Sequence, residues 1–334
     1  MRIIQLHHPE SGRQLALVDE PDLILLSSYS SVYELAKDAL TRSLSIPDLV
    51  KQNRTSLNIK YDDIYFGSSA WSILPAFDHP SDPMHCLVVG TGLTHRASAA
   101  NRNAMHEANP ENMTDSMRMY KLGEEGGKPD NKQIGVQPEW FYKGTGTILR
   151  AHNQSLEVPS FADDGGEEPE VAGAYIIDQD GIPCRIGFAC GNEFSDHEME
   201  KKNYLYLAPS KLRQCAIGPE LSIDESFEDL AGRVAVRRGE KTIWSATISS
   251  GEKAMVHSIA NMEYHHFKYP QHRLPGQAHV HFFGADDFSF GHSIKLADGD
   301  LMEVKWDGMG RALINKLAIA KSPEHPIYVK VLHY

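Results

Sequence analysis

The chain has 334 residues, of which 41% are hydrophobic, and this length is enough to bury one large core or two unequal ones. A formal net charge of -12 leaves no basic surface for phosphates, so neither nucleic acid nor an anionic membrane is an expected partner. No segment approaches the roughly 20 apolar residues of a membrane helix, and the N-terminus lacks an export pattern, so we expect a cytoplasmic protein.

The first 80 residues predict a small α/β domain. Ser31 followed by Glu34 forms a capping box, which predicts a helix start, and a second short helix is expected from Ser45. The proline-rich segment 75–83, PAFDHPSDP, is typical of a connector, so we place a domain boundary near residue 80. Short apolar runs between turns predict strands at residues 2–6, 14–18 and 23–26.

Residues 81–334 predict a larger, mainly β domain. An apolar strand at 86–89 leads into the polar segment 90–108, GTGLTHRASAANRNAMHEA, which predicts either a helix or a mobile flap. From residue 134 onward, short apolar runs such as VAGAYIID and CRIGFAC recur between Gly, Pro and Asp turns. The expected fold class is therefore α+β, mainly β.

Two glutamates stand two residues apart just before the strand VAGAYIID. In extended backbone the carboxylates of Glu168 and Glu170 point to the same face of the sheet. Converging oxygen ligands are what Mg²⁺, Mn²⁺ or Ca²⁺ prefer. Taken alone, the acidic run 163–170 is more typical of a solvated loop before a strand, with metal binding as the alternative.

A second acidic group follows the strand CRIGFAC. Glu193 stands at the end of that strand, and Asp196 begins a probable helix, where acids also serve as caps. Further on, Lys211 lies in an otherwise apolar segment and is a candidate to face a carboxylate cluster. The four cysteines have no close-spaced pair of the zinc or redox type, so we expect reduced packing residues.

Taken in order, these pieces resemble the fumarylacetoacetase-like superfamily over roughly the C-terminal three quarters of the chain. That family shows a Pro and Phe before a Lys, a Glu-x-Glu pair, an Asn-Asp-x-Ser element, a Lys, a Gly-Thr-Pro turn and a closing Gly-Asp pair. The matching residues here are Pro138, Phe141 and Lys143; Glu168 and Glu170; Asn192, Glu193 and Ser195; Lys211; Gly284; and Gly299 with Asp300.

The resemblance implies a mixed β-roll or barrel catalytic domain over 81–334, and a homodimer. It implies Mg²⁺, or else Mn²⁺ or Ca²⁺, as cofactor, and it implies roles for individual residues. Lys211 would be catalytic, Lys143 and Gly284 would bind substrate, and the metal ligands would be Glu168, Glu170 and Glu193. Because Glu193 replaces the family's aspartate, Asp196 is an alternative third ligand. Ala285 and Asp286 replace the Thr and Pro of the family turn, so substrate preference does not carry over.

The implied activity is the dehydration of a 2-keto-3-deoxy sugar acid, such as 2-keto-3-deoxyarabonate or 2-keto-3-deoxyxylonate, through an enolate held by the metal. Arg118 is a further candidate to bind this substrate. An alternative is hydrolysis of a C–C bond in an acylpyruvate or 2,4-dioxo acid, with water activated by His95, His106 and Glu107. A third reading is a non-catalytic sugar-acid binding protein stabilised by Ca²⁺.

Two other patterns are weaker evidence for a binding site. The segments GTGLTH and KGTGTI lack the third glycine and the helix signature of a dinucleotide site, so NAD is not expected. His279 and His281 alternate on one face of a strand, and three more histidines precede them at 265, 266 and 272. A zinc site is one reading, but without a nearby acidic ligand a hydrogen-bonded, half-buried face is favoured.

Overall fold

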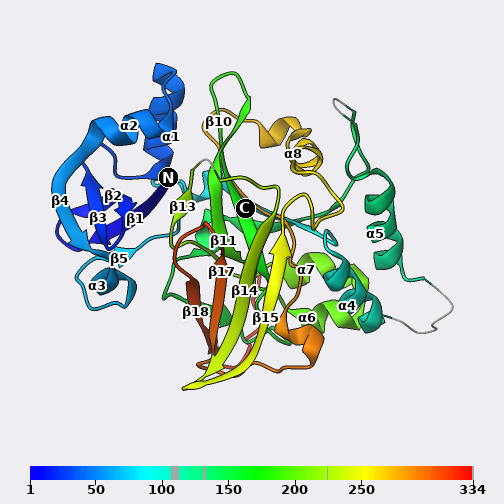
Figure 1. The fold of residues 1–334 in the computed structure, drawn as a ribbon. Coiled ribbons are helices and arrows are strands. Elements are labelled where there is room, and N and C mark those ends of the chain that lie inside the picture. The colour runs from blue at the N-terminus through cyan, green and yellow to red at the C-terminus, as the bar shows by residue number, and fades with distance from the viewer. Residues whose placement is uncertain (107–112, 131–132, 224, 333–334) are drawn as a thin grey trace.

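The computed structural model of the chain describes residues 1–106, 113–130, 133–223 and 225–332, with the backbone alone at 101 and 104–106. Two β-sheets pack against each other at its centre, and the first 80 residues form a lobe at one side (Figure 1). Helices from the middle of the chain lie on the opposite side, where Figure 1 shows α4, α6 and α7 close together. The architecture is the expected α+β fold with mainly β structure.

The N-terminal lobe is an antiparallel sheet with strand order β4-β3-β2-β1 and helices packed against it. As predicted, the Ser31 side chain accepts a hydrogen bond from the Glu34 amide at 3.1 Å, and Ser45 caps the second helix in the same way. The elements of the lobe are β1 (Arg2–His8), β2 (Gly12–Asp19), β3 (Asp22–Leu26), α1 (Val32–Arg42), α2 (Ile46–Asn53), β4 (Arg54–Lys60), α3 (Tyr61–Tyr65) and β5 (Ser72–Ile73).

The lobe has a core of its own, but it is joined to the rest of the molecule by backbone pairing. Ile4, Leu6 and Tyr61 belong to that separate core. Strand β1 pairs antiparallel with β13 (Leu221–Ser222), so the larger sheet runs through both parts. The proline-rich connector is packed rather than loose, since Phe77 is buried in the main core. A division near residue 80 therefore remains an interpretation of a continuous sheet.

The larger sheet continues in the order β13-β11-β10-β16-β6-β7. All nine residues of β10 are buried because both faces of this central strand are covered, which explains its nearly unbroken apolar sequence. The strands in this part are β6 (Cys86–Gly92), β7 (Glu139–Thr145), β8 (Leu149–Arg150), β10 (Pro169–Ile177), β11 (Pro183–Asn192), β12 (Cys215–Ile217), β13 and β16 (Ala278–Phe282).

The second sheet has the order β15-β14-β17-β18-β9. Strand β14 alternates buried and more exposed residues, as expected for a sheet with one face on the core. Trp306 ties this sheet to the larger one, since its Nε1 donates to the Glu170 carbonyl at 2.8 Å. The strands are β9 (Ser155–Val158), β14 (Leu230–Arg238), β15 (Lys241–Ser250), β17 (Leu301–Trp306) and β18 (Leu313–Ile319).

Helices α4 and α6 contact each other, and α7 contacts both α6 and β7, so these short helices cluster around the ends of β10 and β11. The described part of the segment 90–108 contains the expected helix. None of the helices in the described ranges is long and apolar enough to cross a membrane. The helices of this region are α4 (Arg96–His106), α5 (Asp115–Gly126), α6 (His197–Lys202), α7 (Leu207–Lys211) and α8 (Ile259–Phe267).

Candidate metal centre and active-site pocket

Three buried glutamates meet where β10 begins and β11 ends. In the antiparallel register Glu170 lies opposite Gly191 and Pro169 opposite Asn192, which brings the predicted Glu-x-Glu pair beside Glu193. One carboxylate oxygen from each of Glu168, Glu170 and Glu193 lies within 4.8 Å of the others. Among the described residues this is the one group of acidic, histidine or cysteine side chains with metal-site spacing.

Two lysines approach the carboxylates from the protein side. The Lys211 ammonium donates to Oε2 of Glu193 at 2.8 Å and also contacts Oε1 of Glu168. Lys143 forms an ion pair with Glu193 and donates to the carbonyls of Phe194 and Lys211 at 3.0 and 2.9 Å. Both lysine side chains are almost fully buried.

The carboxylates differ in how strongly they hold a proton. Burial opposes ionisation of Glu168, but Lys211 and a hydrogen bond from His197 hold its pKa well below the ordinary value. Burial and repulsion from the other two glutamates raise the pKa of Glu170 well above its usual range. Burial and the charge of Glu168 also raise the pKa of Glu193, to about 7, against the pull of the two lysines. The site thus carries more carboxylate than its lysines neutralise.

Counting the neighbours shows that a divalent cation fits this site. If all five carboxylates around the site were ionised, they would face only three permanent cations, and in the metal-free protein the raised pKa of Glu170 means that a proton offsets part of this negative excess. A bound divalent ion would relieve it, and three carboxylate oxygens are a hard-cation donor set. The carboxylates are Glu139, Glu168, Glu170, Glu193 and Glu200, and the cations are Arg102, Lys143 and Lys211.

His197 supports the site from below. Its ring stacks between Phe288 and Phe290, with ring centroids 4.9 and 5.0 Å away. Its Nε2 lies 3.1 Å from Oε1 of Glu168, and this bond and the carboxylate charge raise the pKa of His197 despite its burial. A histidine that bonds a ligand carboxylate fixes the orientation of that carboxylate.

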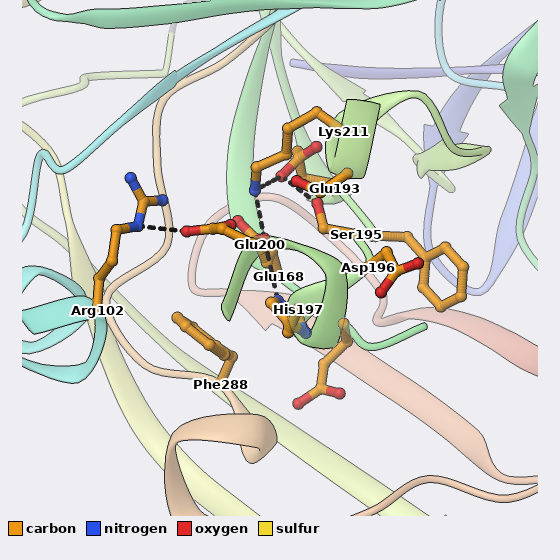
Figure 2. Close-up of polar contacts among 12 residues, drawn as sticks. Arg102, Glu168, Glu193, Ser195, Asp196, His197, Glu200, Lys211 and Phe288 are labelled. Carbon is orange, nitrogen blue, oxygen red and sulfur yellow. Dashed lines mark hydrogen bonds and ion pairs between the residues drawn. The ribbon is translucent and has the colours of Figure 1, made fainter. Parts of the chain in front are cut away.

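A small pocket opens beside the carboxylates. Figure 2 shows Arg102 at the left beside Glu200 and Lys211 above Glu168, with Phe288 and His197 below. The lining residues are Gly92, Leu93, Ser98, Arg102, Glu168, Glu170, His197, Glu200, Gly284, Ala285 and Phe288.

Arg102 is held firmly in this wall. Its Nη1 donates to both carboxylate oxygens of Glu139, at 2.7 and 2.6 Å, and its Nε lies 2.6 Å from Oε1 of Glu200. Gly92 makes room for this arrangement, because a Cβ at that position would lie 1.9 Å from Oε1 of Glu139. The pocket therefore has a fixed cationic group facing its fixed acidic floor.

Gly284 lies in the pocket, as the resemblance implied, and its conformation explains why a glycine is needed. Its φ is +95°, and a Cβ would approach Oγ1 of Thr94 to 2.0 Å. Its amide donates to Oε2 of Glu170 at 2.6 Å, which helps to orient that carboxylate. Direct binding of substrate by Gly284 stays a prediction.

Two predicted substrate-binding residues are placed elsewhere. Lys143 directs its three ammonium protons at protein acceptors, so its position fits support of Glu193 rather than contact with substrate. Arg118 is exposed on α5, where it pairs with Asp115, and it lines a different surface hollow from the glutamates. The reason is that α5 packs away from the ends of β10 and β11.

Asp196 is not part of the carboxylate cluster. It caps α6 through the Met199 amide at 2.9 Å and pairs with Arg213 at 2.8 Å. The chain turns at Phe194, whose φ is +36°, so the side chains on either side of it diverge. The third candidate ligand is therefore Glu193 and not Asp196.

The predicted water-activating residues are only partly described. His95 is buried, its Nδ1 lies 2.9 Å from Oγ1 of Thr94, and burial lowers the pKa of its ring to about 3. It is not among the residues that line the pocket. The side chain of His106 and the whole of Glu107 lie outside the described residues. Of this set, the structure therefore places only His95, and His95 lies outside the pocket lining.

The histidines of β16 form a neutral layer instead of a zinc site. His266 Nε2 lies 3.0 Å from His279 Nδ1, and His281 Nε2 lies 2.7 Å from Oγ1 of Thr91. Burial lowers the pKa of both His279 and His281 to about 3. No three of these described histidines reach metal-site spacing.

Sequence reasoning missed three pocket residues: Arg102, His197 and Glu200. His197 and Glu200 lie just after Asp196, in a stretch whose acidic residues are also typical of a helix cap. Arg102 lies in the segment 90–108, in which the histidines are the more usual catalytic residues. The signal that could have found it is an arginine in a small-residue helix that follows the buried strand 86–89.

Comparison with known proteins identifies the fold. No sequence-family model and no curated protein matches the chain. A 2-keto-3-deoxy-D-arabinonate dehydratase complexed with magnesium and 2,5-dioxopentanoate is similar with a TM-score of 0.71 at 18% identity, over 96% of this chain and 100% of that one. A 5-carboxymethyl-2-hydroxymuconate delta-isomerase from Mycobacterium smegmatis has a TM-score of 0.58 at 16% identity, with the same coverage. The chain therefore shares the fold of these enzymes, in agreement with the mainly β fold expected from its sequence.

Proposed function

We propose that the chain is a divalent-metal-dependent dehydratase that removes water from a 2-keto-3-deoxy sugar acid, such as a 2-keto-3-deoxypentonate. The observation that carries this proposal is the buried glutamate cluster beside Lys211. It is supported by the shared fold with a dehydratase that was solved with magnesium and a 2-oxo acid. The proposed cofactor is Mg²⁺, with Mn²⁺ or Ca²⁺ as alternatives.

The proposed ligands are Glu168, Glu170 and Glu193. A divalent ion held there would polarise the 2-oxo group of the substrate and so make the protons on C3 more acidic. His197 and the Gly284 amide hold two of the carboxylates in place, and Lys143 holds the third. The ligand set is thus preorganised by the protein.

Lys211 has the role of a fixed positive charge. Burial alone would lower the pKa of its ammonium, but the charges of Glu168 and Glu193 raise it far above neutrality. Lys211 therefore keeps its proton and acts as a donor, not as a base. Its charge stabilises the negative charge that builds up on the 2-oxo oxygen when C3 loses a proton.

Dehydration also needs a group that moves a proton between C3 and the departing C4 hydroxyl. Glu200 is the pocket carboxylate that lies outside the proposed ligand set, and only 5% of its side chain is exposed. We assign this proton transfer to Glu200. The pairing with Arg102 keeps its carboxylate directed at the pocket wall opposite Lys211 (Figure 2).

The test is to incubate metal-stripped protein with 2-keto-3-deoxypentonates and acylpyruvates, with and without Mg²⁺ or Mn²⁺, and to follow products by NMR. Dehydration predicts a 2-oxo semialdehyde that forms only when metal is added. Lys211→Met should lower kcat by about 10²–10³-fold, as for the loss of one donor at a developing oxyanion. Lys201→Met is the matched control, because it makes the same change at an exposed lysine of α6.

Other products would replace the proposal with one of its alternatives. Pyruvate and a free acid would establish C–C bond hydrolysis and would return attention to His95. Ligand binding without turnover, retained in Lys211→Met, would establish a binding protein. Absence of both turnover and binding would overturn the assignment of a 2-oxo acid site.

We also propose that the chain forms a homodimer. Exposed apolar side chains gather near the 3₁₀ turn Tyr204–Tyr206 and the end of α7, where Leu205 is 69% exposed and Leu212 is 50% exposed. Such a patch is more typical of an interface than of a free surface. Light scattering should give twice the chain mass for the wild type and a lower mass for Leu205→Asp. Monomeric wild-type protein would contradict this proposal.

A further inference from the structure

We propose that Arg102 makes the pocket selective for 2-oxo acids with a hydroxyl group at the end remote from the carboxylate. This inference rests on the proposed function, because it takes the 2-oxo acid end of the substrate to lie at the glutamate cluster. It assigns a specificity-determining role to a residue that no sequence motif pointed to.

Arg102 lies where the remote end of a bound substrate would reach. Arg102 lies on α4 and lines the same pocket as Glu168 and Glu170, where it is paired with Glu200 of α6 (Figure 2). A substrate whose carboxylate and 2-oxo group reach the glutamates therefore extends its other end toward α4 and α6. On that side the polar pocket residues are Ser98, Arg102 and Glu200.

The guanidinium group of Arg102 is held in place and has one nitrogen available for a ligand. Nη1 and Nε of Arg102 are bonded to Glu139 and Glu200, whereas Nη2 has no hydrogen-bond partner among the described residues. Guanidinium N–H groups are donors only, so Nη2 can satisfy an oxygen but not another donor. Because two carboxylates already hold the side chain, little rotamer freedom is lost when a ligand binds.

The charges around Nη2 of Arg102 determine which kind of substrate oxygen it can bind. Arg102 lies between two carboxylates, so this group of three side chains carries a net negative charge. A second carboxylate on the substrate would be repelled there, whereas a neutral hydroxyl accepts from Nη2 at no electrostatic cost. A methyl group at the same place would leave the Nη2 protons buried against carbon and without a partner. The environment therefore favours a hydroxyl over both a methyl and a carboxylate.

Three ligands that cannot be dehydrated test this inference, because all of them lack a C4 hydroxyl. They are 5-hydroxy-2-oxopentanoate, 2-oxopentanoate and 2-oxoglutarate, which end in a hydroxyl, a methyl and a carboxylate. Their Kd values for the wild-type protein with saturating Mg²⁺ would be measured by calorimetry, and concentrations would be corrected by NMR for the open-chain keto form. We expect the hydroxyl ligand to bind about tenfold more tightly than either of the others.

The variant Arg102→Lys sharpens the test. It keeps a positive charge between Glu139 and Glu200, but it loses the planar fork that leaves Nη2 for the ligand. The preference for the hydroxyl ligand should fall to within about twofold. Arg96→Lys, the same change at an exposed position of the same helix, should keep the wild-type preference.

Each outcome decides the question. Equal binding of the three ligands to the wild type would overturn the selectivity, and this result does not depend on whether any variant folds. Tighter binding of 2-oxoglutarate would show selection of a carboxylate and would also overturn it. A preference that survives in Arg102→Lys would assign selectivity to another residue. Failure of all three ligands to bind would remove the 2-oxo acid site itself, whereas the NMR turnover assay judges the dehydratase reaction separately.

Discussion

Two buried polar clusters lie on neighbouring strands of the larger sheet, and burial has opposite effects on their charge. The glutamates flank the start of β10, and the histidines His279 and His281 lie on β16, which pairs with β10. Both clusters come from residues two apart in extended backbone. The glutamate cluster stays charged and gathers lysines, whereas the histidine layer loses its charge and pairs its rings with one another.

The difference shows why only one of the two is a candidate for chemistry. Buried imidazoles become neutral when their pKa falls, so the histidine layer needs no ion. The glutamates cannot all become neutral in this way, because the two lysines hold at least part of the cluster ionised. A negative excess beside an open pocket is the condition for binding a cation and a polarised substrate.

The largest expected effect comes from removing a lysine that supports the charged cluster. Lys143→Met removes one of the two ammonium groups that pair with buried Glu193 and leaves only Lys211, so the free energy of unfolding of the metal-free protein at pH 8 should fall by about 3–5 kcal/mol. Urea denaturation measures this change. The double variant Lys143→Met/Glu193→Gln should recover most of the loss, and an unchanged single variant would show that the pair contributes little.

A second prediction distinguishes Glu193, as a proposed metal ligand, from the neighbouring Asp196. Asp196→Asn removes the partner of buried Arg213 and should cost about 3 kcal/mol of stability, while leaving the Kd for Mg²⁺ within about threefold. Glu193→Gln should do the reverse and weaken Mg²⁺ binding by at least about tenfold. Calorimetric Mg²⁺ titrations and urea melts of both variants provide the data. A larger loss of Mg²⁺ affinity in Asp196→Asn would make Asp196 the ligand.

The buried histidines should make the protein less stable in acid. The pKa of His279 is about 3 in the folded state, below its value of about 6.5 in the unfolded chain, so the unfolded state binds more protons between these values. The stability contributed by neutral His279 is fully present above pH 6.5 and is lost as the pH falls. Between pH 6.5 and 4.5 the free energy of unfolding should fall by about 2 kcal/mol because of this residue, and His279→Gln should remove that part of the pH dependence. His325→Gln, at an exposed position, is the control.

The smallest expected effect is at Arg118, which belongs to neither cluster. Because its ion pair with Asp115 is exposed, Arg118→Ala should change stability by less than about 0.5 kcal/mol. Turnover and KM should also stay within about twofold of wild type. A large increase in KM would return Arg118 to the substrate site and would contradict its placement on the outer side of α5.

The sequence alone determined what depends on short spacing. The two-residue step between Glu168 and Glu170 sets both carboxylates on one face of a strand, whatever that strand packs against. Ser31 and Ser45 start helices because a hydroxyl three residues before a free amide satisfies it locally. The mainly β character of residues 81–334 follows in the same way from short apolar runs between turns.

The tertiary structure alone decided which distant side chains complete the site. The register of β10 on β11 and the turn at Phe194 select Glu193 over Asp196, and no local pattern encodes that choice. The packing of α4 against α6 brings Arg102 to Glu200, 98 positions apart in the numbering from 102 to 200. Such pairs depend on how separate elements pack, because the electrostatic partner of a buried charge is set by proximity in space and not by its neighbours in sequence.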